Sequence, residues 1–371
     1  MQYANEFRIT RLRSEVVAHR GIHGGKRRAA PAALVAAAIL ISGCTANVAS
    51  PAPVTTPRAS ANSTDVMPER FWAFTAPWDA RSDSSLREHE PVLDVAITGW
   101  IQLDSASGHP ELLYADDSAR ASATTRRFAL VTSWHGRGFH PEMVRRLGSS
   151  PGNLGKAASR VARLVARGGY SGIVLDLEEQ SVADTALTAR VLRVLADSVR
   201  GHGASTVAIA LPAADTAAYP TRAFFPAADF ALIMLYDEHW STSAPGPVAT
   251  PDWVRRTLAQ RVADVGADRI VAALPVYGYL WRANEPAEPL SFADAQRAAS
   301  RAGVEIGRDP ASRSLHAIQP GSWELWSSDA ESVRALREEV AALGVTRIAL
   351  WRLGQEDPNV WPLVARWSAP R

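Results

Sequence analysis

Eight short apolar runs alternate with stretches of helical periodicity between about residues 70 and 365. Continuous apolar strands that alternate with amphipathic helices are typical of a parallel sheet covered by helices on both faces. Eight such units in one stretch of chain predict an α/β fold, the (β/α)8 TIM barrel. The apolar runs lie at residues 71–74, 93–101, 127–132, 173–177, 207–211, 230–236, 270–276 and 347–351.

Helical patterns fall between these runs, at residues 155–167, 183–200, 253–265 and 330–343. A doubly wound open sheet is the alternative fold, but no glycine-rich phosphate loop follows the first run. The segment 281–326, between the seventh and eighth runs, is too long for an ordinary loop. It contains a helix-like stretch at 293–299 and a strand-like stretch at 315–318. We therefore expect a small α+β insertion between strands 7 and 8, on the face formed by the carboxyl ends of the strands.

The N-terminal segment has the features of an export signal. Several basic residues precede an apolar run from Ala29 to Ile41, which is short for a bilayer span of about 20 residues. Ile41-Ser42-Gly43-Cys44 follows, and it resembles a bacterial lipoprotein box in which Cys44 is lipidated. The alternative is an incidental cysteine after an ordinary signal peptide. Because the basic region is long, the position of the true start codon is not fixed by the sequence. Residues 1–44 are thus predicted as signal peptide and lipobox, and 67–371 as the folded domain.

Residues 45–66 consist mostly of Ala, Pro, Ser and Thr, a composition that predicts a flexible tether. Together with Cys44, this tether predicts an extracytoplasmic, membrane-anchored protein of the cell envelope. A single cysteine excludes an intramolecular disulfide. The net charge of +2 gives no support for nucleic-acid binding, and we expect a monomer. The 12 tryptophans suit core packing, and they also suit the binding of flat sugar rings.

The fourth apolar run ends in carboxylates spaced by two. Side chains alternate along a strand, so Asp176 and Glu178 point to the same side of the sheet. Buried carboxylates are costly, so their presence at the end of a buried strand needs a reason. In a parallel barrel the carboxyl end of a strand is where catalytic groups lie. A strand-end pair that caps the next helix is the structural alternative.

Four motifs in chain order resemble glycoside hydrolase family 18, the chitinase and N-acetylglucosaminidase family. Gly172 to Glu178 is similar to its Asp-Gly-x-Asp-x-Asp-x-Glu strand, although Ser171 and Val174 replace the first two Asp. The other three matches are Met234-Leu235-Tyr236-Asp237, Leu274-Pro275-Val276-Tyr277-Gly278, and Trp351 at the end of the last run. Asp176-Leu177-Glu178-Glu179, Tyr236 to Trp240 and Trp351 to Asp357 resemble a bacterial branch that includes peptidoglycan glucosaminidases.

The resemblance implies a mechanism without an enzyme nucleophile, in which the N-acetyl oxygen of the substrate attacks the anomeric carbon. Glu178 would be the general acid, and Asp176 would stabilise the oxazolinium intermediate. Tyr236 and Asp237 would orient the N-acetyl group and the hydroxyls, and Trp351 would stack beneath the sugar. Met234, Tyr277, Glu179 and His239 are the further residues that we expect to contact substrate.

These features predict a glycosidase that hydrolyses a β-linked polysaccharide containing N-acetylglucosamine, with retention, and that uses no cofactor and no metal. A metal site at Asp176, Glu178 and Glu179 is disfavoured because no histidine stands at a matching strand end. His135 and His140 are interpreted as loop residues. Two other functions stay open: a carbohydrate-binding protein that uses the same cleft without turnover, and a factor for exopolysaccharide assembly. Val174 favours low turnover, whereas the presence of Glu178 favours an enzyme.

Overall fold

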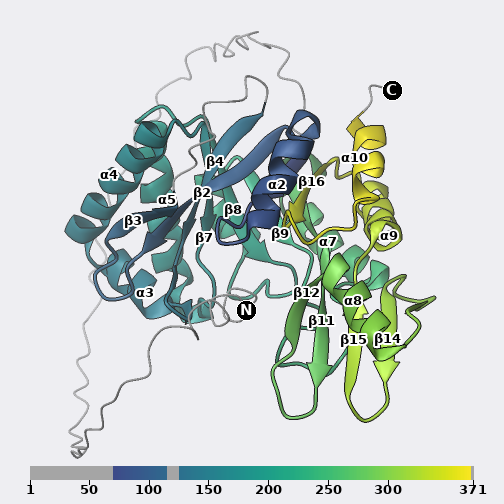
Figure 1. The fold of residues 1–371 in the computed structure, drawn as a ribbon. Coiled ribbons are helices and arrows are strands. Elements are labelled where there is room, and N and C mark those ends of the chain that lie inside the picture. Colours follow the sequence, from purple (N-terminus) through teal and green to yellow (C-terminus); the bar gives the residue numbers. More distant parts are fainter. Residues whose placement is uncertain (1–69, 115–124, 369–371) are drawn as a thin grey trace, which may run out of the picture. The chain divides into compact units, whose positions relative to one another are not determined.

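The computed structural model describes residues 70–114 and 125–368. Signal peptide, Cys44 and tether therefore lie outside the described residues. In the described part, parallel strands pair in the order β1-β16-β10-β9-β8-β7-β4-β2, and β1 also pairs with β2. That last pairing closes the sheet into an eight-stranded parallel barrel, which confirms the predicted fold (Figure 1). The barrel strands are β1 (Phe71–Phe74), β2 (Val95–Leu103), β4 (Arg126–Thr132), β7 (Gly172–Asp176), β8 (Thr206–Pro212), β9 (Phe230–Met234), β10 (Ile270–Pro275) and β16 (Arg347–Trp351).

Helices follow most barrel strands and cover the outside of the barrel (Figure 1). They are α2 (Ala80–His89), α3 (Pro141–Ser149), α4 (Pro151–Gly168), α5 (Thr185–Arg200), α6 (Thr221–Phe224), α7 (Pro251–Val265), α9 (Ala330–Ala342) and α10 (Val360–Ser368). Side chains that point outward from the strands, such as Ile173 and Leu175, pack against the apolar faces of these helices. None of the described helices is long and apolar enough to span a membrane.

Side chains that point inward from the strands fill the barrel with a second apolar cluster. Trp72, Phe128 and Val174 belong to it, and each is fully buried. The edge of the Trp72 ring contacts Phe128, with the ring centroids 5.1 Å apart. The barrel interior below the carboxyl end of β7 is therefore filled with apolar side chains. Val174 points into this apolar interior two residues before Asp176, and the period-two alternation holds along the whole strand.

The predicted insertion is a five-stranded antiparallel sheet with one helix, α8 (Phe292–Ala302). Its strands are β11 (Tyr277–Arg282), β12 (Glu288–Ser291), β13 (Gly307–Arg308), β14 (Leu315–Gln319) and β15 (Trp323–Ser327). It begins at Tyr277, earlier than the predicted boundary at residue 281, because β11 starts directly after the carboxyl end of β10. Gly278 permits this sheet, since a Cβ there would lie 2.3 Å from the Trp326 carbonyl oxygen.

Two short antiparallel elements on the barrel have no counterpart in the sequence-based prediction. Strand β3 (Pro110–Tyr114) folds back on β2, and β5 (Trp134–His135) pairs with β6 (Gly138–Phe139). Both follow the carboxyl ends of barrel strands. They therefore extend the rim of the barrel at the end where Asp176 lies, since Gln102 of β2 pairs with Thr132 of β4 and Thr132 pairs with Asp176.

Candidate active site

A pocket of about 490 Å³ opens at the carboxyl ends of the barrel strands. Glu178, Met234, Tyr236, Asp237 and Trp351 line it, so the structure brings together most of the side chains that the sequence predicted. They come from the ends of β7, β9 and β16, which are far apart in the sequence. Asp176 lies directly behind Glu178 and is 2% exposed.

Glu178 and Asp176 form a coupled pair of carboxyl groups. Burial, and then the charge of Asp176, raise the pKa of Glu178 well above its ordinary value. A hydrogen bond between the two carboxyl groups acts in the same direction, because one of them must carry the shared proton. The Thr132 hydroxyl donates to Asp176 Oδ2 at 3.0 Å and accepts from the Trp134 amide at 3.0 Å. Burial and the neighbouring carboxylate therefore both favour the protonated form of Glu178.

The main chain around Glu178 is fixed by buried polar contacts. The Gln180 side-chain amide donates to the Glu178 carbonyl oxygen at 2.8 Å, and the Gln180 backbone amide donates to the Tyr219 hydroxyl at 2.8 Å. Tyr219 in turn donates to the Leu177 carbonyl oxygen at 3.3 Å. These contacts hold the segment after β7 in place, so the Glu178 carboxyl group keeps its position at the pocket wall.

Asp237 is held by two phenols from the inserted sheet. Tyr277 donates to Asp237 Oδ1 at 2.5 Å, and Tyr279 donates to the same oxygen at 3.2 Å. Burial, and then the charge of Asp237, raise the pKa of Tyr277, so its phenol remains a donor. Asp237 has a φ of 59°, a left-handed backbone conformation in which non-glycine residues are uncommon. Tyr277 is fully buried and does not line the pocket, so its contact is with Asp237.

Aromatic rings form the floor and one side of the pocket. Tyr236 and Trp351 lie nearly parallel, with centroids 6.0 Å apart and an interplanar angle of 22°. Trp240 and Trp253 also line the pocket and are partly exposed. Trp253 reaches the pocket from the start of α7. Flat apolar faces of this kind suit sugar rings.

The opposite wall, Pro212 to Asp215, is held by a buried arginine. Arg261 of α7 is 0% exposed. Its guanidinium group donates to the carbonyl oxygens of Pro212 at 2.5 Å and Asp215 at 3.1 Å. It also donates to the Tyr219 carbonyl oxygen at 2.6 Å. Arg261 therefore links the pocket wall after β8 to helix α7.

Besides Tyr277, two other residues predicted as substrate contacts, Glu179 and His239, do not line this pocket. Glu179 is exposed and has a φ of 59°, because the chain turns there beyond the end of β7 at Asp176. His239 lies against Gly246, and its Nδ1 contacts the Pro247 carbonyl oxygen at 3.0 Å. His239 therefore packs within the loop between β9 and α7. In the described residues no group of three or more His, Cys, Asp or Glu is placed to hold a metal ion.

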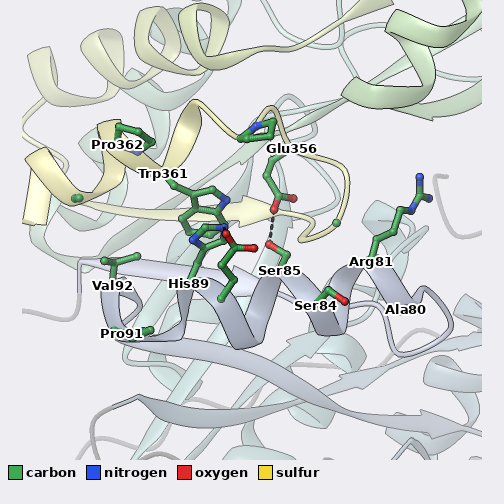
Figure 2. Close-up of a pocket in the computed structure, with 14 residues that line it drawn as sticks. Ala80, Arg81, Ser84, Ser85, His89, Pro91, Val92, Glu356, Trp361 and Pro362 are labelled. Carbon is green, nitrogen blue, oxygen red and sulfur yellow. Dashed lines mark hydrogen bonds and ion pairs between the residues drawn. The ribbon is translucent and has the colours of Figure 1, made fainter.

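A larger cavity, of about 870 Å³, lies between α2 and the segment from Gly354 to Ala365 (Figure 2). Its side chains interact with one another, since Ser85 donates to Glu356 and the His89 ring stacks on Trp361 with centroids 4.0 Å apart. His89 thus covers the one tryptophan face that could bind a sugar there. We place the candidate active site in the barrel because, of these two cavities, the barrel pocket is the one in which the described residues combine the Asp176–Glu178 carboxyl pair with partly exposed aromatic rings.

The burial of Trp351 predicts a cost in stability when the ring is removed. Trp351 is 2% exposed, and its ring contacts the edge of Phe74 at 5.0 Å as well as Tyr236. Trp351 therefore contributes to the packing of the barrel as well as lining the pocket. Deleting a buried Trp side chain typically costs about 3–5 kcal/mol. We expect a loss of this size in the free energy of unfolding by urea, whereas Trp240→Ala at the partly exposed rim should cost much less. Equal losses would contradict the structural placement.

The raised pKa of Glu178 predicts how stability depends on pH. In the unfolded chain this carboxyl group titrates near its ordinary pKa of about 4.3. Between that pH and the higher pKa of the folded state, the native protein holds a proton that the unfolded chain releases, so stability falls as pH rises. Glu178→Gln removes this dependence. The melting temperature of the variant should therefore rise relative to that of the wild type from pH 4 to pH 8, and a constant difference would refute the raised pKa.

The relatives of the chain have names that refer to glycosylase or cortex-lytic activity. The chain is 28% identical over 255 residues to YdhD of Bacillus subtilis, designated a sporulation-specific glycosylase; the alignment covers 64% of this chain and 61% of YdhD. It is 24% identical over 266 residues to the cortical fragment-lytic enzyme of B. subtilis, covering 67% and 61% of the two chains. The chain thus spans about three fifths of each relative's length. No family model matches it.

Solved structures share the fold. The spore cortex-lytic enzyme SleL of Bacillus cereus superposes with a TM-score of 0.71 at 19% identity, covering 80% of this chain and 73% of SleL. A chitinase of Chromobacterium violaceum superposes with a TM-score of 0.71 at 23% identity, covering 82% of this chain and all of the chitinase. By its relatives and by its fold, the chain is confirmed as similar to the chitinase-like proteins of glycoside hydrolase family 18.

Proposed function

We propose that the chain is a glycoside hydrolase that cleaves a β-linked polysaccharide containing N-acetylglucosamine. The observation that carries this proposal is the placement of Glu178 at the pocket beside Asp176, where burial and the neighbouring charge raise its pKa, together with the nearly parallel Tyr236–Trp351 ring pair. The names of the relatives support the same class of reaction. A general acid needs a proton at neutral pH and a position next to the leaving oxygen, and a raised carboxyl pKa supplies the first of these.

The proposed reaction is substrate-assisted and retaining. The N-acetyl oxygen of the bound sugar attacks its anomeric carbon while the glycosidic bond breaks, and Glu178 transfers its proton to the leaving oxygen. Glu178, now a carboxylate, then accepts a proton from the water that attacks the anomeric carbon and opens the oxazolinium ring. In this proposal Asp176 binds the N-acetyl N–H and stabilises the positive charge. Asp237 and Tyr236 orient the sugar, Trp351 and Met234 form the floor, and Tyr277 positions Asp237.

We assign the role of general acid to only one of the carboxyl groups that line the pocket. Asp215 also lines the pocket, but its side chain accepts from the Ala218 amide at 2.9 Å and it is exposed at the rim. Asp237 has two phenol donors on one oxygen, which suits a carboxylate that accepts hydrogen bonds. Glu178 is therefore the acid in the proposal, and Asp237 and Asp215 are contacts.

The location is also part of the proposal. Signal peptide, lipidated Cys44 and tether 45–66 would place the barrel outside the cytoplasm at a membrane surface, near cell-envelope polymer. Names of relatives that refer to the spore cortex support action outside the cytoplasm. A lipid anchor with two or more chains holds a protein stably, whereas one chain does so only marginally.

The experiment is a turnover assay of the purified protein on three polymers: chitin oligomers, poly-N-acetylglucosamine and peptidoglycan glycan strands. We expect new reducing ends on at least one of them. NMR of the reaction should show that the first product formed has the β configuration at its anomeric carbon. Binding without new reducing ends would favour the carbohydrate-binding alternative. A first product with inverted configuration would contradict the mechanism while leaving the hydrolase proposal in place.

A further inference from the structure

A second cavity, of about 590 Å³, lies on the flank of the barrel and is lined by positive charge. It is bounded by the turn from Ala106 to Pro110 after β2 and by helices α3 and α4. Cationic side chains from both helices line it, and no Asp or Glu does; we call it the basic groove. Its cations are Arg146, Lys156, Arg160 and Arg163.

Helix α4 supplies most of this charge by its sequence pattern. Its buried face is apolar, with Leu154, Val161 and Val165 among the residues packed on the barrel. Its basic residues recur at positions 156, 160, 163 and 167, spacings of four, three and four that form one stripe. Residues 151–168 contain no Asp or Glu at all, so the stripe has no acidic neighbour on its own helix.

Two of the cations are held at the groove by backbone oxygens. Arg146 Nη2 donates to the Ser105 carbonyl oxygen at 2.5 Å, and Arg160 Nε donates to the Pro110 carbonyl oxygen at 2.6 Å. Both of these partners are neutral. In the described residues none of the four groove cations forms an ion pair, whereas Arg145, next to Arg146, pairs with Asp184 at 2.6 Å.

The acids near the groove have other partners. Asp104 accepts from the Ser107 amide at 2.8 Å, and its Oδ2 lies 3.7 Å from His135 Nδ1. Glu142 of α3 contacts His140 Nδ1 at 3.0 Å, and its charge also interacts with that of Arg146. Neither carboxylate lines the groove, and the charged side chains among the described residues that line it are all cationic, so the groove attracts anions.

The groove lies at the same end of the barrel as the candidate active site. The turn at its edge follows Leu103, the last residue of β2. In the sheet, Gln102 is level with Thr132 of β4, and Thr132 is level with Asp176 of β7. The turn therefore begins at the level of the Asp176 carboxylate, two strands away. A long ligand could reach both the pocket and the groove.

We infer that the basic groove binds an anionic polymer. Lys156 and Arg163 are seven residues apart on α4, which corresponds to roughly 10 Å along the helix. The positive charge is therefore spread along the helix, and a chain that carries carboxylate or phosphate groups on successive units can contact several of the cations at once. The concave shape, which encloses a ligand between the turn and two helices, favours such a chain over the flat surface of a membrane.

The experiment measures binding of the full chain to labelled poly-L-glutamate and to labelled inorganic polyphosphate, by fluorescence anisotropy at low salt. Neither polymer is a glycoside, so the result is independent of turnover. We expect binding to at least one, weakened by added salt. Lys156→Gln/Arg163→Gln should weaken it by at least about tenfold, because each exposed cation near an anionic surface contributes roughly a fivefold effect. The polymer that binds more tightly identifies the anionic group.

A matched control changes the same charge elsewhere. Arg256 and Arg301 are exposed on α7 and α8 and do not line the groove, so Arg256→Gln/Arg301→Gln should retain binding within about twofold. Equal loss in both double variants would show that net charge alone attracts the polymers, and would overturn the site. Absence of binding to either polymer would overturn it as well. If neither polymer binds but phosphatidylglycerol vesicles do, and that binding depends on Lys156 and Arg163, the proposal of a polymer site would also be overturned.

Discussion

Glu178→Gln is expected to lower turnover on the best substrate by about 10²–10⁴-fold, the range that a general acid typically contributes. Glutamine has nearly the same shape, so the pocket and its aromatic floor should keep their geometry. Ligand affinity should therefore stay within a few-fold of the wild type, and the loss should appear in kcat. Steady-state kinetics, together with calorimetric titration of an oligomer into the variant, separate the two quantities.

Glu179 provides the control for that experiment. It is the next residue in the chain, carries the same functional group and does not line the pocket. Glu179→Gln should retain turnover within about threefold. If Glu179→Gln loses activity and Glu178→Gln keeps it, the assignment of the acid is wrong, because the alternation along β7 would then direct the opposite carboxylate to the substrate.

Removing the N-acetyl group from the substrate is expected to have an effect at least as large. An intramolecular nucleophile in the correct geometry reacts as if at very high concentration, so fully deacetylated oligomers should react at least about 10³-fold more slowly. A thiazoline analogue of the oxazolinium intermediate should bind much more tightly than the product sugar, because it resembles the transition state. Product release measured on matched acetylated and deacetylated oligomers gives the first comparison, and competition for the pocket gives the second.

The opposite result would identify a different mechanism. Equal hydrolysis of acetylated and deacetylated oligomers would exclude substrate assistance. Asp176 would then be the first carboxylate to examine as a nucleophile, since it lies next to Glu178. That outcome would leave the role of Glu178 as the acid untouched, so the two predictions test separate parts of the mechanism.

The fold was predictable from the sequence because each barrel strand can be recognised from its own short stretch of sequence. Each apolar run became a barrel strand, with ends shifted by only a few residues, since buried parallel strands tolerate few polar side chains. Strand β3 was missed because its exposed face carries Glu111 and Leu113 and breaks the apolar pattern. The start of the insertion was placed too late because β10 and β11 join with almost no linker.

The site was predictable only in part because strand ends and loops follow different rules. Residues at or near strand ends, such as Asp176, Glu178 and Trp351, follow from the period-two pattern and the family motifs. Trp253 and Asp215 reach the pocket from helix α7 and from the loop after β8, and no local pattern indicates that. Glu179 and His239 could not be excluded from the sequence. Glu179 follows the end of β7 with a φ of 59°, and the His239 ring is turned away by a contact with the Pro247 carbonyl oxygen.

The valine two residues before Asp176 has a consequence for how protons move during a catalytic cycle. Among the described residues, Val174 and aromatic rings such as those of Trp72 and Phe128 form apolar packing below the carboxyl pair. In the proposed cycle, the proton that Glu178 gives to the leaving oxygen would therefore be returned from the pocket side, by the attacking water. The first proton has to be in place earlier, so the protonation state of the pair in the free protein would decide whether a binding event leads to cleavage.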